Sequence, residues 1–93
     1  WIYPILKDFP KSERYTLVEK IHDTLLSFIS KVVEARKVED KNRILKQADA
    51  ELEKLKVLMR LSKDQEFISM GQYRKASEKL DELGKMLGGW MKS

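Results

Sequence analysis

The sequence has no cysteine, a single histidine, two prolines and four glycines among its 93 residues. Without cysteine, the chain can form no disulfide, no thiolate nucleophile and no cysteine-based metal site, and this is compatible with a reducing compartment. We therefore expect a cytoplasmic protein. Few glycines and prolines combined with 37% charged residues are typical of a helical bundle rather than of a disordered tail.

Long apolar runs are also missing. No stretch of about twenty apolar residues exists and no signal peptide is visible, so we expect a soluble protein without a membrane partner. The length suits one domain over residues 1–93, with a modest core that association with other copies would stabilise.

The stretch Arg43–Ser62 is the strongest helical signal in the chain. It contains no glycine or proline, and its apolar and small residues recur at steps of three and four, which places them on one face of an α-helix. These residues are Ile44, Leu45, Ala48, Leu52, Leu55, Met59 and Ser62. The pattern predicts a central helix with this face buried.

A second apolar seam, formed by Ala50, Val57 and Leu61, lies on roughly the opposite side of the same predicted helix. An apolar stripe on each side indicates either an unusually enclosed helix or an interface between copies of the chain. We take the oligomer interface as the working hypothesis for this seam.

The first residues predict the end of a helix, because Ile2, Leu6 and Phe9 have helical spacing and Pro10 then stops it. Since the sequence begins at Trp1 rather than at methionine, we expect the natural helix to begin earlier, so that the first helix is truncated here.

The second helix begins after Ser12 or after Thr16, and Thr16 has Glu19 at the spacing of a capping box. Two adjacent apolar stripes follow. Together they form a face wide enough to pack against two neighbouring helices, as a helix inside a bundle does. The first comprises Leu17, Val18, Ile21, Leu25, Phe28 and Val32, and the second comprises Tyr15, His22, Leu26, Ile29 and Val33.

The last helix has the clearest start, a capping box of Ser69 with Gln72. One apolar stripe runs from Tyr73 to Trp90, and Gly88–Gly89 predicts a C-terminal cap. The chain is therefore expected to be all-α, an antiparallel up-down four-helix bundle with short loops and a truncated first helix.

A metal site is the sharpest enzymatic hypothesis, because Glu19 and His22 are spaced as in ferritin-like di-iron bundles. That architecture needs two such motifs, and His22 is the only histidine. No phosphate loop, nucleophile elbow or catalytic triad spacing appears. We expect no metal, no cofactor and no enzymatic activity, and interpret His22 as a residue of a core edge or an interface.

Cations offer a second functional hypothesis. The formal net charge is +4, and basic residues gather between the end of the second helix and the end of the third. This distribution favours a polyanionic partner, although an ordinary solvated helical surface explains each cation alone. The candidate nucleic-acid-binding residues are Arg36, Lys37, Lys41, Arg43, Lys54, Lys56, Arg60 and Lys63.

Two segments resemble a known family. Phe9–Leu17 is similar to the Phe-Pro-Lys-x-Glu-x-aromatic-x-Leu segment of small four-helix-bundle proteins that include the products of ribosomal RNA intervening sequences. Leu83–Met91 resembles the Gly-x-x-Leu-Gly-Gly/Ser-Trp ending of the accessory variability determinant (Avd) proteins of diversity-generating retroelements, and Leu55–Leu61 fits the same group.

The resemblance implies a homopentameric barrel of four-helix bundles with a basic surface. It also implies a non-catalytic accessory protein that binds the retroelement's reverse transcriptase and its RNA or cDNA, and that supports mutagenic reverse transcription and retrohoming. The alternative is a protein-interaction module of the intervening-sequence type, with no reverse-transcriptase partner.

Overall fold

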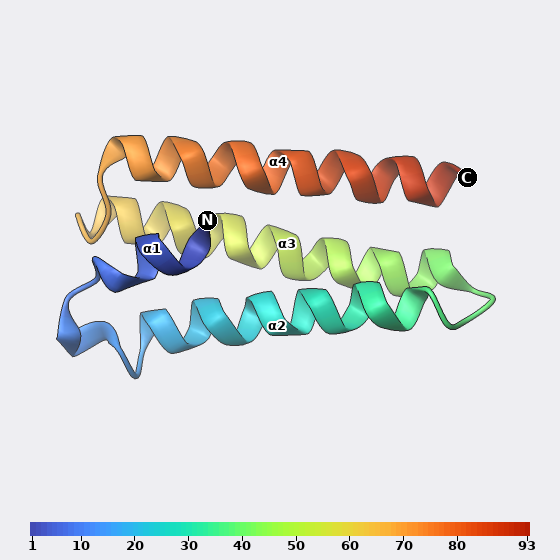
Figure 1. The fold of residues 1–93 in the computed structure, drawn as a ribbon, viewed down its shortest axis with the longest axis horizontal. Helices are drawn as coiled ribbons and strands as arrows, with labels where there is room; N and C mark the ends of the chain where they lie inside the picture. Colours follow the sequence, from blue (N-terminus) through green and yellow to red (C-terminus); the bar gives the residue numbers. More distant parts are fainter.

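In the computed structural model, which describes residues 1–93, the chain forms four α-helices, one 3₁₀ turn and no strand. The helices are α1 (Ile2–Lys7), α2 (Leu17–Ala35), α3 (Lys41–Asp64) and α4 (Met70–Lys92), and the 3₁₀ turn η1 is Lys11–Glu13. Figure 1 shows α2, α3 and α4 running side by side in alternating directions, with α3 in the middle. The all-α prediction is confirmed.

The predicted stripe of α3 is the centre of the core. The seven residues of this stripe are all buried, and none of them is more than 1% exposed. They pack with the buried side chains of α2 and α4, among them Ile21, Phe28, Leu80 and Leu87. The spacing of three and four thus identified the buried face correctly.

Two hydroxyl groups lie inside this core without breaking it. Ser62 Oγ donates a hydrogen bond to the carbonyl of Leu58, and Thr24 Oγ1 donates one to the carbonyl of Lys20, both at 2.7 Å. Each hydroxyl is thereby satisfied within its own helix, because a helical serine or threonine can reach the carbonyl four residues earlier.

The short helix α1 covers only part of the bundle. Its residues Ile2, Ile5 and Leu6 are buried in the core cluster, as is Phe9, whose ring lies 5.9 Å from that of Phe67. Figure 1 shows α1 in the half of the molecule where α3 ends and α4 begins. The predicted helix is confirmed for Ile2 and Leu6, but α1 ends at Lys7, before Pro10, so Phe9 is buried from the segment that follows the helix.

Beyond α1, the other half of the bundle carries an apolar groove between α2 and α4. Its volume is about 360 Å³, and it is lined by Phe28, Val32, Leu83, Met86, Leu87 and Trp90. Nearby on α2, the second predicted stripe is exposed at Leu26, Ile29 and Val33. The tryptophan is half-buried and packs against the core cluster.

Of the two predicted capping boxes, only the one at the start of α4 is present. The capping box of Ser69 and Gln72 is present, with hydrogen bonds of 3.1 and 2.8 Å. Thr16 does precede α2, but its hydroxyl donates to the Glu13 carboxylate at 2.9 Å instead of accepting from a helix amide. The predicted capping box of Thr16 with Glu19 is therefore wrong.

The helix ends differ from the predictions more than the helix starts do. The prediction that Gly88–Gly89 caps the last helix is wrong, because α4 continues through both glycines to Lys92 and no glycine has a positive φ. A left-handed residue occurs instead at Glu66, with φ 63°, just after α3. The Glu66 and Phe67 amides donate to the carbonyls of Lys63 and Ser62, the paired bonds of a Schellman motif.

Glu66 is held in a conformation that glycine adopts at much lower cost. The variant Glu66→Gly should stabilise the protein by up to about 1 kcal/mol, because the left-handed region strains a residue with a Cβ. Urea unfolding followed by circular dichroism measures the difference. Gln65→Gly is the matched control, since Gln65 has a φ of −84° and gains nothing from glycine. Equal destabilisation by both variants would contradict this account of the turn.

Candidate association surface and nucleic-acid interface

The second seam of α3 is exposed in the single chain. Val57 is 66% exposed and Leu61 43% exposed, and Ala50 is exposed as well. The seam borders two shallow depressions on the outer side of the α2–α3 pair, one containing Ala50 and Val57 and the other containing Leu61. That a further chain covers the seam remains a prediction.

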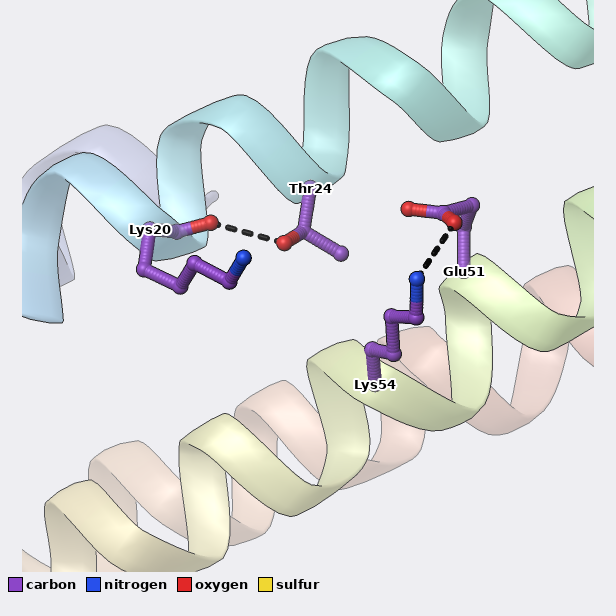
Figure 2. A network of polar contacts seen from close by, with 4 residues as sticks. All are labelled: Lys20, Thr24, Glu51 and Lys54. Carbon is purple, nitrogen blue, oxygen red and sulfur yellow. Dashed lines mark hydrogen bonds and ion pairs between the residues drawn. The ribbon is translucent and has the colours of Figure 1, made fainter.

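Lysines from both helices flank this seam. Figure 2 shows Lys20 of α2 and Lys54 of α3 on either side of the space between their helices, with both ammonium groups directed into it. Lys54 Nζ is 2.9 Å from Glu51 Oε1, whereas the Lys20 ammonium forms no ion pair. The depression around Val57 is lined by Lys20, Ala50, Glu53, Lys54, Val57 and Leu58.

The candidate nucleic-acid-binding cations fall into two groups. One group is already paired with carboxylates at 2.9 to 3.5 Å: Arg43 with Asp40, Lys54 with Glu51, Lys56 with Glu53 and Asp81, and Lys63 with Asp64. The other group forms no ion pair and consists of Arg36, Lys37, Lys41 and Arg60. Lys41 does donate hydrogen bonds to the Ser93 carbonyl and hydroxyl oxygens at 3.0 and 3.1 Å.

These cations do not share one face. Lys41 and Lys63 lie near opposite ends of α3, roughly 33 Å apart at 1.5 Å per residue. Lys54 borders the groove towards α2, whereas Lys56 and Lys63 reach α4, where Lys63 Nζ lies 4.9 Å from the centre of the Tyr73 ring. Arg36, Lys37, Lys41 and Arg43 lie around the α2–α3 turn, whereas Lys56, Arg60 and Lys63 follow one another at steps of four and three near the other end of α3.

Lys56 is the most constrained of these side chains. Partial burial lowers the pKa of its ammonium, but the hydrogen bond and attraction of Glu53 and the attraction of Asp81 outweigh this and raise the pKa above the usual 10.5. The group therefore stays protonated at neutral pH and ties α3 to α4. A cation held in this way is less available to an incoming phosphate than an unpaired one.

The Glu19–His22 pair has no metal-binding geometry. His22 Nε2 lies 3.2 Å from the Tyr3 hydroxyl on α1. No three histidine, cysteine, aspartate or glutamate side chains gather in a group that could hold a metal ion. The histidine thus lies at the edge between α1 and α2.

A pocket that sequence reasoning missed lies beside His22. It has a volume of about 390 Å³, is enclosed by α1, η1 and the start of α2, and is lined by Tyr3, Leu6, Lys7, Phe9, Pro10, Lys11, Arg14, Val18 and His22. Sequence spacing gave no signal for it, because Pro10 separates the helix of Tyr3 and Lys7 from the turn of Lys11.

These features define an all-α helical protein with exposed apolar and basic surfaces, and none of its helices combines the length and apolar character that membrane crossing requires. A family model described as bAvd-like matches residues 1–93, so the chain belongs to the bAvd-like family and the resemblance to Avd proteins is confirmed. No curated protein and no solved structure matches the chain.

Proposed function

We propose that this protein is a non-catalytic accessory protein of a diversity-generating retroelement. It binds the element's reverse transcriptase and its RNA or cDNA, and thereby supports mutagenic reverse transcription and retrohoming. The observation that carries the proposal is the bAvd-like family match over the whole chain. The chain acts as one helical-bundle domain over residues 1–93, in the cytoplasm.

The seam of Ala50, Val57 and Leu61 is proposed as the contact between copies, which by family resemblance form a pentamer. Its support is the exposure of Val57 and Leu61, since an interface that removes their remaining apolar surface from water gains up to about 1.5 to 3 kcal/mol for each side chain, the value for one that starts fully exposed. The lysines beside the seam, with Glu51 and Glu53, give this contact a charged border.

The cations around the α2–α3 turn are proposed as the main phosphate contacts. Arg36 and Lys37 are exposed and unpaired, and Lys41 and Arg43 follow at the start of α3. A ring of copies repeats this small cluster around one axis. The repeated charge strengthens binding to a phosphate backbone in a way that depends steeply on salt.

Binding to the reverse transcriptase is the direct test of the proposed role. The purified chain is mixed with the reverse transcriptase of the same retroelement and with an unrelated reverse transcriptase of similar charge. We expect a stable complex in size-exclusion chromatography with the first enzyme only. If neither enzyme forms a complex, the interaction module without a polymerase partner becomes the better assignment.

The association surface is tested by placing charge in the seam. The double variant Val57→Glu and Leu61→Glu should dissociate the assembly and leave helicity largely unchanged, because the two carboxylates would be desolvated in the interface. Light scattering at micromolar concentration measures the mass. Val38→Glu with Met70→Glu adds the same charge at exposed apolar positions outside the seam and should leave the mass unchanged. A monomeric mass for the unaltered protein would refute the proposal.

The nucleic-acid interface is tested by charge reversal at the α2–α3 turn. Changing Arg36, Lys37, Lys41 and Arg43 to glutamate should weaken binding to all single-stranded sequences alike and flatten the salt dependence. A salt titration with a labelled oligonucleotide measures both quantities.

The matched control for this titration reverses the unpaired α4 cations Arg74, Lys75, Lys85 and Lys92, which changes the net charge equally. If the control weakens binding as much as the turn variant does, overall charge and not the turn carries the affinity.

A further inference from the structure

The pocket between α1, η1 and α2 has the make-up of a ligand site that the proposed function does not use. Its volume of about 390 Å³ falls within the range of small-molecule sites. Lys7, Lys11 and Arg14 contribute three cations to its lining, and no carboxylate lines it. The elements that line it, α1, η1 and the start of α2, lie towards the end of the bundle opposite the α2–α3 turn (Figure 1), so its cations are separate from Arg36 and Lys37.

The three cations are free for a ligand. None of them forms an ion pair with an acidic side chain, in contrast to the paired lysines of α3. The neighbouring carboxylates are held elsewhere: Asp8 accepts a hydrogen bond from the Gln72 side-chain amide at 2.6 Å, and Glu13 accepts one from Thr16 at 2.9 Å.

Two further acidic residues flank His22 on α2. Glu19 and Asp23 are both exposed, and neither lines the pocket. The lining itself therefore carries cationic side chains and no carboxylate, and ammonium and guanidinium donors suit a phosphate group better than a lone carboxylate.

An aromatic side chain completes the site. Tyr3 is 54% exposed and contacts His22, because its hydroxyl lies 3.2 Å from His22 Nε2 and the two rings are 5.9 Å apart with a tilt of 52°. An exposed ring in this position offers a face on which a planar base can stack. Base stacking of this kind tolerates any sequence, since every base has a π-face.

We propose that this pocket binds one nucleotide of a single-stranded nucleic acid. Lys7, Lys11 and Arg14 hold its phosphate, and the base stacks on Tyr3 beside His22. The proposal goes beyond the accessory role described above, because it concerns different residues and requires neither the reverse transcriptase nor the assembly.

The experiment uses uridine 5′-monophosphate and inorganic phosphate as probes in separate NMR titrations at fixed pH. His22 is the only histidine, so its imidazole protons report on the pocket without ambiguity. We expect the nucleotide to cause saturable chemical-shift changes of the His22 imidazole and of the Lys11 and Arg14 amides. Inorganic phosphate should bind at least about fivefold more weakly, because a fivefold difference in affinity corresponds to the weakest stacking of a base on an aromatic ring. A mononucleotide is too short to reach the α2–α3 turn, so a negative result here does not count against that interface.

Two variants separate the roles of charge and ring. Lys11→Gln with Arg14→Gln should abolish saturable binding of both probes, whereas Tyr3→Leu should weaken only the nucleotide, to the level of inorganic phosphate. Arg74→Gln with Lys75→Gln, an equal loss of charge on α4, should change neither. These residues are exposed, and unchanged helicity confirms that each variant is folded.

Three results would overturn the proposal. The first is the absence of saturable shifts with millimolar nucleotide. The second is equal affinity for nucleotide and inorganic phosphate, which would leave only an anion site. The third is an equal effect of the α4 control, which would show that the shifts follow overall charge and not the pocket.

Discussion

The burial of one stripe of α3 is the constraint on which the rest of this structure depends. Ile44, Leu45, Leu52, Leu55 and Met59 are almost completely removed from water, and each contributes on the order of 1.5 to 3 kcal/mol. Because α2 and α4 both pack against this helix, the remaining arc of α3 points outwards. That arc carries the exposed seam of Val57 and Leu61, so the core and the proposed contact between copies belong to the same helix.

Regular periodicity made the fold predictable, and the exceptions have local causes. The stripe of α3 and the capping box at Ser69 follow from spacing alone, because both depend on residues within one or two turns. The end of α3 does not, since Glu66 adopts a left-handed turn for which glycine is the usual signal. Gly88 carries that signal but lies inside α4, where packing of Leu87 and Trp90 against the core outweighs the helix penalty.

The sequence indicated which kinds of residue form the candidate surfaces, but it did not indicate all of their ion pairs or the position of the pocket. The pair of Lys54 with Glu51 lies within one helical turn and could be deduced from spacing. The link from Lys56 to Asp81 crosses between helices, so it depends on how α3 and α4 are aligned. The pocket around Tyr3 and Arg14 likewise exists only because α1 folds back beside α2, and no local pattern encodes that docking.

The continuation of α4 through its glycines has a consequence for the dynamics of the bundle. Gly84, Gly88 and Gly89 lie in its last turns, and each lowers helix stability by about 1 kcal/mol relative to alanine. A Cβ at Gly84 would lie an ordinary 3.6 Å from Leu52, and nothing lies within 4 Å at the other two, so no close backbone approach requires glycine at these positions. We therefore expect this segment to open at lower free energy than α3, in a local unfolding event that would uncover Phe28 and Val32 while the centre of the fold stays closed.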